Sequence, residues 1–227
     1  MAEPHSDLQA AYDKLKRRQA RNERVQFARG LMRGVLSMLK PGDVVFDCGA
    51  NRGDVAEPLA ETGASVHAFE PDPFAFATLS TRLAGRPNVT LHNAAVGVTA
   101  GRIRLMRDEN FDDNPKGGSV RSTVIPGGRR INEAEGAGVE VDLVALPDMI
   151  RDIARDTGEI AFIKMDIEGA ELELLEHMQA ERLFDLVRLT VAETHEHKFR
   201  DLRPRFEALR RDIAAAHPVT RVNLDWI

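Results

Sequence analysis

Cysteine and aromatic residues are scarce in this chain, and long apolar runs are missing. Cys48 is the only cysteine among 227 residues, which excludes an internal disulfide framework and any cysteine-cluster zinc site. No stretch approaches the roughly 18 apolar residues that span a bilayer, and residues 1–30 lack the apolar core of a signal peptide. Aromatic residues amount to 5%, with one Trp and one Tyr, too few for a platform that stacks nucleic-acid bases. We therefore expect a cytoplasmic protein with no membrane segment, and the composition argues against nucleic acid as a partner.

The length and the charge balance describe an ordinary globular protein whose charge is unevenly distributed. A chain of this length with 30% charged and 43% hydrophobic residues can bury one substantial core. The net charge is −5, yet residues 14–33 carry +7 and the rest of the chain −12. A solvated helix face that docks on the acidic body is one interpretation, and an anionic partner such as phosphate or nucleic acid is the other. The basic residues of this segment, set against Glu23 alone, are Lys14, Lys16, Arg17, Arg18, Arg21, Arg24, Arg29 and Arg33.

Apolar residues at helical spacing predict one long N-terminal helix over residues 7–39, which Pro41 and Gly42 end. Beyond it, short apolar runs alternate with helical stretches. This alternation predicts right-handed βαβ units and therefore an α/β fold, a doubly wound, mostly parallel sheet with helices on both faces. The predicted strands are residues 43–47, 65–69, 88–93, 160–165, 186–192 and 218–224, and the predicted helices between them are 54–62, 72–84, 147–156, 169–180 and 202–216.

The long helix and the alternating region are two parts of different character. We predict a basic helical extension over residues 1–40, which caps the protein or mediates oligomerisation, followed by one ligand-binding domain over residues 41–227. The apolar stripe formed by Val25, Leu31 and Leu36 on the helix favours a homodimer.

Residues 107–138 interrupt the alternation with a glycine-rich stretch that is too long for an ordinary connection. We therefore predict a functional loop there, a candidate lid over the substrate. Its Arg121, Arg129 and Arg130 are candidates to bind a carboxylate or phosphate of the substrate, or they are simply exposed.

The turn after the first predicted strand is the first candidate binding element, because ligands of open α/β sheets bind beyond the carboxyl ends of the strands. Gly49 and Gly53 permit a tight turn and close backbone approach. A dinucleotide site has the pattern G-x-G-x-x-G here, whereas this turn has G-x-x-x-G, with Asp47 two residues before it. Asp47 would repel a pyrophosphate and attract a free ammonium such as that of S-adenosylmethionine. A purely structural turn is the alternative.

The next two predicted strands end in residues that suit a nucleoside. Glu70 follows the second strand, where an acid accepts hydrogen bonds from both hydroxyls of a ribose, or else caps the next helix. Asn93 and Ala94 end the third strand and are small enough to lie against an adenine ring.

Charged residues follow the fourth and fifth predicted strands. The acidic run that begins at Asp166 exceeds what helix capping requires. Glu193 and His195 come directly after the fifth strand, and His195 is a candidate base because the histidine pKa lies near working pH. Lys164, inside the fourth strand, needs a carboxylate partner when buried, and we expect it to pair with a nearby acid such as Glu193.

With these residues placed, the sequence resembles the FkbM family of class I S-adenosylmethionine-dependent methyltransferases. The likeness covers roughly residues 41–196 and rests on three blocks: VFDCGANRG at 45–53, AFEP at 68–71 and IKMDIEGAE at 163–171. The third block is the most specific, because other class I methyltransferases have a different signature at that strand. Arg52 and Asp54 depart from the family pattern, which usually has apolar or aromatic residues there.

The resemblance implies a Rossmann-like sheet of seven strands, one more than the apolar runs predict. It implies methyl transfer from S-adenosylmethionine to a small acceptor, mostly a hydroxyl of a sugar or of a secondary metabolite. Asp166 would face the transferred methyl group and belongs to the implied cofactor set. The other implied cofactor residues are Asp47, Gly49, Ala50, Asn51 and Gly53 at the methionine end, Glu70 and Pro71 at the ribose, and Asn93 and Ala94 near the adenine.

Methyl transfer to oxygen requires alignment of acceptor oxygen, methyl carbon and sulfur, and removal of the hydroxyl proton. We expect His195 to be the base, Glu193 to orient it or the substrate, and Asp166 to bond the acceptor hydroxyl or the cofactor ammonium. A metal-assisted variant places Mg²⁺ on Asp166, Glu193 and His195.

Three other functions stay open on the sequence alone. The basic N-terminal helix is compatible with an RNA methyltransferase. A nicotinamide-dependent oxidoreductase shares the Rossmann-like sheet, although Asp47 and the missing G-x-G-x-x-G argue against it. In a cofactor-binding scaffold without turnover, the helix 7–39 would serve dimerisation only.

Overall fold

The short apolar runs become the strands of one parallel sheet in the computed structural model, which describes residues 4–128, 130–134 and 137–226. The strands are β1 (Val44–Cys48), β2 (Ser65–Phe69), β3 (Val89–His92), β7 (Phe162–Met165), β8 (Thr190–Ala192) and β9 (Val222–Asn223). They are hydrogen-bonded in the order β3-β2-β1-β7-β8-β9, and every neighbouring pair is parallel. The order reverses beside β1, so the carboxyl ends of β1, β2, β7 and β8 meet at the ligand-binding edge.

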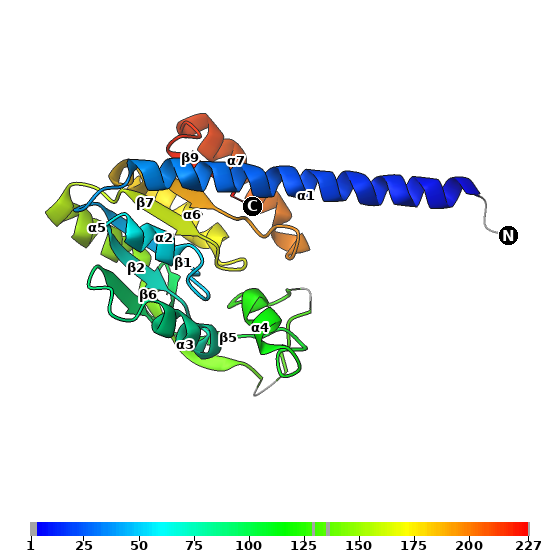
Figure 1. The fold of residues 1–227 in the computed structure, drawn as a ribbon, viewed down its shortest axis with the longest axis horizontal. Coiled ribbons are helices and arrows are strands. Elements are labelled where there is room, and N and C mark those ends of the chain that lie inside the picture. Colours follow the sequence, from blue (N-terminus) through cyan, green and yellow to red (C-terminus); the bar gives the residue numbers. More distant parts are fainter. Residues whose placement is uncertain (1–3, 129, 135–136, 227) are drawn as a thin grey trace.

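Helices cover both faces of this sheet (Figure 1). In β1, Phe46 and Cys48 belong to the hydrophobic core on one face and Val45 to the core on the other, because successive side chains of a strand point to opposite faces of the sheet. On the Val45 side lie α1 (Pro4–Met38), α2 (Ala56–Glu61) and α3 (Pro73–Arg82), and on the Phe46 side lie α5 (Leu146–Thr157), α6 (Glu171–Ala180) and α7 (Arg203–Ala216). The predicted α/β class and the doubly wound arrangement are confirmed.

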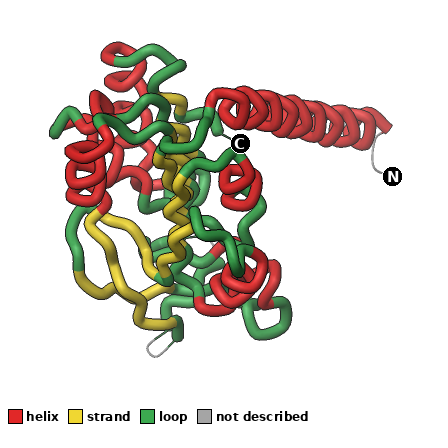
Figure 2. Tube along the Cα trace, turned by 60° about the vertical axis from the view of Figure 1, so that its left-hand side comes forward, coloured by secondary structure: helices red, strands yellow, loops and turns green. Residues whose placement is uncertain are grey.

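A second sheet of three strands is the main departure from the sequence prediction. It consists of β4 (Ala94–Gly97), β5 (Gly101–Leu105) and β6 (Val139–Ala145) in the order β4-β6-β5, visible beside the main sheet in Figure 2. Ala95, Leu105 and Val141 form its small core. The implied seven-stranded sheet is therefore wrong for the described residues, which have six strands in one sheet and three in another. The apolar runs of β4 and β5 are too short and too close to β3 to be separated by pattern alone.

The remaining short elements lie in connections. Within the long connection from β5 to β6 are α4 (Pro115–Gly118) and η1 (Ser119–Arg121), and the later ones are η2 (Leu183–Leu186) and η3 (Arg200–Leu202). The 107–138 segment is thus partly helical.

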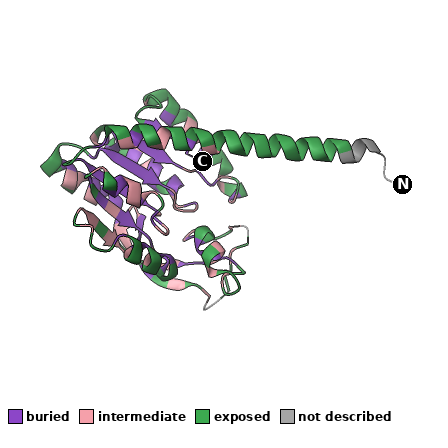
Figure 3. Ribbon diagram, viewed as in Figure 1, coloured by how far each residue is buried: buried purple, intermediate pink, exposed green. Residues whose placement is uncertain are grey.

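Helix α1 confirms the predicted N-terminal helix and extends beyond the body (Figure 1). Ala28, Val35 and Leu39 are buried against the α2 side of the sheet, whereas residues 8–24 are all exposed (Figure 3). None of the helices in the described ranges combines the length and the apolar run needed to cross a bilayer. The division at residue 40 and the homodimer stay predictions.

Candidate active site

The turn after β1 folds back onto the end of β2. The Gly49 N–H donates to the Phe69 carbonyl oxygen at 3.0 Å, and the Asn51 N–H donates to Glu70 Oε2 at 2.8 Å. Gly49 has φ +79°, and a Cβ atom there would lie 1.9 Å from the Asp166 carbonyl oxygen. Only glycine fits this position, because both the backbone conformation and the lack of space exclude a side chain.

Glu70 is fixed at the end of β2 by backbone donors. Its side chain is buried, and its second carboxylate oxygen accepts a hydrogen bond from the Asp72 N–H at 2.8 Å. Burial raises the pKa of Glu70 to about 7, against the opposing effect of the two N–H donors. The Asn93 amide donates to the Glu70 carbonyl oxygen at 2.8 Å and so joins the end of β3 to this corner.

A cavity of about 290 Å³ opens at the carboxyl edge of the main sheet. Its β2 and β4 side is apolar, with Phe69, Ala95 and Val96, and its β7 and β8 side is acidic, with Asp166 and Glu193. Seven of the ten predicted cofactor residues line it: Gly49, Ala50, Asn51, Glu70, Pro71, Ala94 and Asp166. The other three, Asp47, Gly53 and Asn93, are not among the lining residues.

Asp47 is buried beneath the cavity, where it pairs with Lys164. The Lys164 Nζ atom lies 3.2 Å from Asp47 Oδ1 and 3.5 Å from Asp166 Oδ2, and it donates to the Gly49 carbonyl oxygen at 2.8 Å. The expectation that Lys164 pairs with a nearby acid is confirmed, but the acid is Asp47 rather than Glu193, because Asp47 is the opposing residue on the neighbouring strand β1. Asp47 therefore forms a buried ion pair, and its predicted contact with a ligand ammonium stays a prediction.

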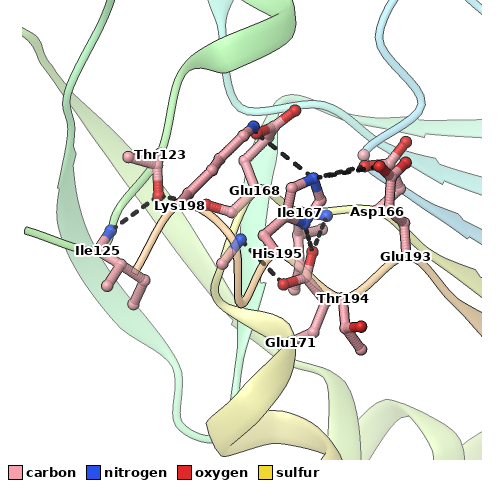
Figure 4. A network of polar contacts seen from close by, with 12 residues as sticks. Thr123, Ile125, Asp166, Ile167, Glu168, Glu171, Glu193, Thr194, His195 and Lys198 are labelled. Atoms are coloured by element: carbon pink, nitrogen blue, oxygen red, sulfur yellow. Dashed lines mark hydrogen bonds and ion pairs between the residues drawn. The ribbon is translucent and has the colours of Figure 1, made fainter. Parts of the chain in front are cut away.

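His195 lies at the centre of a cluster of carboxylates from the ends of β7 and β8 (Figure 4). Its side chain is 2% exposed, and its Nε2 atom is 3.5 Å from Glu168, 3.7 Å from Asp166 and 3.8 Å from Glu193. The structure thus brings the three predicted catalytic residues together. Asp166 and Glu193 line the cavity, and His195 lies directly behind them.

Glu171 orients the His195 ring, a role that sequence reasoning missed. The His195 Nδ1–H donates to Glu171 Oε1 at 3.0 Å, and the fully buried carboxylate also accepts from the N–H groups of Ile167 (2.7 Å) and Gly169 (2.9 Å). Glu171 stands in the acidic run of the third motif, which is the only signal that the sequence offers. Its contact with a histidine 24 residues later depends on the packing of β8 beside β7.

The cluster changes the protonation of its members. Burial alone lowers the pKa of His195, but the hydrogen bond to Glu171 and the nearby carboxylates outweigh it and raise that pKa to about 9. Burial and the neighbouring Asp166 raise the pKa of Glu193 to about 7. Burial lowers the pKa of Lys198, which donates to Glu168 Oε2, to about 8.

Three side chains of this cluster have the composition of a metal site. Ligand atoms of Asp166, Glu168 and His195 lie within 4.8 Å of one another, so Glu168 takes the place that the sequence prediction gave to Glu193. However, Lys198 contacts Glu168, and Lys164 lies near Asp166, so both carboxylates already have a cationic partner.

The 107–138 segment forms one wall of the cavity through residues of η1 and the loop after it. These residues are Ser119, Val120, Ser122, Thr123 and Val124. Arg107 pairs with the buried Asp72 at 2.9 Å, and the Thr123 hydroxyl donates to the Glu168 carbonyl oxygen at 2.7 Å. Arg121 pairs with Asp108 at 3.0 Å. Arg129 lies outside the described residues, and Arg130 is exposed.

Comparisons with known proteins find related methyltransferases. A family model described as the methyltransferase FkbM domain matches residues 47–215. The chain is 31% identical over 182 residues to the 31-O-demethyl-FK506 methyltransferase FkbM of Streptomyces tacrolimicus, covering 70% of this chain and 67% of that protein. It is 29% identical over 218 residues to the methyltransferase sdnD of Sordaria araneosa, covering 84% of this chain and 80% of that protein.

Among solved structures, the chain shows a weak likeness to the 1,6-didemethyltoxoflavin-N1-methyltransferase of Burkholderia thailandensis, solved with 1,6-didemethyltoxoflavin and S-adenosylhomocysteine. The TM-score is 0.23 at 17% identity, covering 70% of this chain and 81% of that chain. A likeness this weak gives no information about the site.

Proposed function

The chain belongs to the FkbM methyltransferase family, and on that premise we propose that it transfers a methyl group from S-adenosylmethionine to a hydroxyl oxygen of a small acceptor, a sugar or a secondary metabolite. The name of the Streptomyces relative specifies a substrate that lacks a methyl group on oxygen, which supports oxygen as the acceptor atom. The observation that carries the proposal is the position of His195 and its carboxylates at the acidic side of the cavity.

The residues around the cavity fit S-adenosylmethionine. Gly49, Ala50 and Asn51 line the cavity and would contact the methionine end, and Glu70 has carboxylate lone pairs left for ribose hydroxyls after it accepts two N–H bonds. Ala94, Ala95 and Val96 offer a flat apolar surface for a ring. When bound, this cofactor supplies an electrophilic methyl group on a sulfonium.

The acidic side of the cavity is suited to the acceptor. Asp166 lies at the junction of the two sides and can accept a hydrogen bond from the acceptor hydroxyl or from the cofactor ammonium. In the transfer, the bond from methyl carbon to sulfur breaks as the bond from acceptor oxygen to methyl carbon forms. The hydroxyl proton must leave at the same stage.

We propose that His195 accepts the proton that leaves the acceptor hydroxyl. Glu171 holds the Nδ1–H, so the Nε2 atom faces Asp166 and Glu193 at the cavity. A ring whose pKa is about 9 is mostly protonated at neutral pH. Beside a positively charged sulfonium the pKa of His195 would fall, and its Nε2 atom would then be free to accept the hydroxyl proton. The orienting acid is Glu171 rather than Glu193.

We propose that no Mg²⁺ is needed, because Lys198 and Lys164 already neutralise Glu168 and Asp166. Turnover should be unchanged after dialysis against EDTA. A loss of activity that added Mg²⁺ restores would overturn this assignment and favour the metal-assisted variant.

Calorimetric titration of S-adenosylhomocysteine into wild type, Glu70→Ala and Glu61→Ala tests the cofactor assignment. Glu61 is an exposed acid at the end of α2 and serves as the control. We expect the Glu70 variant to bind about tenfold more weakly, or about 1.4 kcal/mol, and the control to bind as wild type does. Absence of binding to wild type would overturn the proposal, and NADH titration would then test the oxidoreductase alternative.

A further inference from the structure

The face of α1 that contacts the body continues outward as a basic face. Residues seven positions apart lie on nearly the same side of a helix. Ala28 and Val35 are buried against the body, and the next positions outward in this row are Arg21 and Lys14. The two flanking rows change from apolar to basic in the same way. We call the resulting set the basic face: Lys14, Arg17, Arg18, Arg21 and Arg24.

The basic face carries charge without compensation. All five side chains are exposed, and none of them forms an ion pair with any described residue. From Lys14 to Arg24 the helix rises about 15 Å, because an α-helix rises about 1.5 Å per residue. Five cations along this distance repel one another and attract a multiply charged anion.

A groove lies between Arg24, at the inner end of this face, and two residues that also line the cofactor cavity. It encloses about 720 Å³ between α1 and the segments that follow β8 and β9. Glu193 and Trp226 line both the groove and the cofactor cavity, so the groove lies next to the acidic side of that cavity. Arg24 and Phe27 form its α1 side, and the other lining residues are Glu23, Thr194, Glu196, His197, Arg210, Leu224 and Asp225.

The inner part of the groove suits a neutral or apolar body. Phe27 is 54% exposed although it is aromatic, and it shares the lining with Leu224 and Trp226. Arg210 partly offsets two of the four acids that line the groove, because it pairs with Asp225 at 2.8 Å and with Glu196 at 3.3 Å; the other two are Glu23 and Glu193.

We propose that this groove is the acceptor site and that the basic face binds a phosphate group of the acceptor, at the end remote from the methylated hydroxyl. The inference rests on the proposed methyl transfer and names its substrate class. A phosphate fits better than a carboxylate, because it carries a charge of about −1.5 to −2 and its oxygens match the guanidinium fork. The acceptor body lies between Phe27 and Trp226, with its hydroxyl at Glu193 and His195.

The emission of Trp226, the only tryptophan of the chain, provides the binding assay. Inorganic tripolyphosphate is titrated into the full-length protein saturated with S-adenosylhomocysteine. The test variant is Arg21→Glu/Arg24→Glu, and the control is Arg29→Glu/Arg33→Glu, which makes the same charge change at exposed positions of the same helix outside the basic face. Circular dichroism confirms that α1 stays helical in both.

We expect saturable binding to wild type and to the control, weakened about tenfold or more in the test variant. We also expect hydroxylated sugars to be methylated faster as their phosphates, with a higher KM and an unchanged kcat in the test variant. Equal binding to all three proteins, or none, overturns the inference. So does binding of a single-stranded RNA oligonucleotide with the same dependence on Arg21 and Arg24 when phosphorylated sugars are not methylated.

The two proposals fail separately. Wild type that binds S-adenosylhomocysteine but not tripolyphosphate overturns the phosphate site and leaves the methyl transfer intact. Wild type that binds tripolyphosphate through Arg21 and Arg24 but not S-adenosylhomocysteine overturns the proposed function, and with it the acceptor role of the groove.

Discussion

The two halves of the ligand-binding edge are built in different ways. At the ends of β1 and β2, backbone groups make the site: Gly49 and Asn51 fold onto Phe69 and Glu70 through N–H donors. At the ends of β7 and β8, side chains make it, and His195 is held by a ring of carboxylates. The cofactor half therefore depends on backbone conformation, and the catalytic half depends on charge.

The largest effect should come from the catalytic half. We expect His195→Ala to lower kcat by about 10²- to 10⁴-fold, because the general base is lost. Transfer of tritiated methyl groups to the best of a panel of hydroxylated sugars measures the rate. His177→Ala, a half-buried position in the last turn of α6, is the control and should match wild type. A His195 variant within about twofold of wild type would exclude the base assignment.

The backbone half is tested by two glycines that share a positive φ. At Gly49 (φ +79°) a Cβ atom would meet Asp166, whereas at Gly85 (φ +76°) it would meet nothing within 4 Å. Gly85→Ala should cost only about 1 kcal/mol of stability and leave S-adenosylhomocysteine affinity unchanged. Gly49→Ala should also lower that affinity by roughly a hundredfold, or about 2.7 kcal/mol. If the two variants have the same affinity in calorimetry and the same stability in thermal unfolding, the close approach of Gly49 to Asp166 does not contribute to cofactor binding.

Glu171→Gln distinguishes a positioning role from a merely structural one. Wild-type activity should rise with pH as the His195 ring loses its proton, because Glu171 and the other carboxylates hold its pKa high. Removal of the Glu171 charge lowers that pKa, so the rising limb should move to lower pH, while the plateau falls about tenfold. The pH profile of kcat measures both. A uniform loss of rate with no shift of the limb would mean that Glu171 only supports the fold.

The smallest expected effect is the pH dependence of cofactor binding. The pKa of Glu70 is raised to about 7, so the carboxylate is ionised above that pH and protonated below it. Since only the ionised form accepts two ribose hydroxyls, S-adenosylhomocysteine affinity should be level above pH 7 and fall by up to about tenfold per unit below it. Calorimetry at a series of pH values measures this, and the Glu70→Gln profile should be flat. The same dependence in Glu70→Gln would assign the titration to another group.

The sequence predicts the cofactor half of the ligand-binding edge better than the catalytic half. Gly49 and Glu70 could be placed because each closely follows a predicted parallel strand, and the carboxyl ends of such strands mark the ligand-binding edge. The partner of Lys164 and the contact of Glu171 with His195 could not, because strand pairing decides them. The three-stranded sheet was also missed, since β5 and β6 pair across the long 107–138 connection.

The most direct test of the account is calorimetry of S-adenosylhomocysteine with His195→Ala beside Glu70→Ala. If the two halves are separate, the His195 variant binds within about threefold of wild type, whereas the Glu70 variant binds about tenfold more weakly. Equal loss of affinity in both variants would contradict the account, because His195 would then hold the cofactor rather than move the proton.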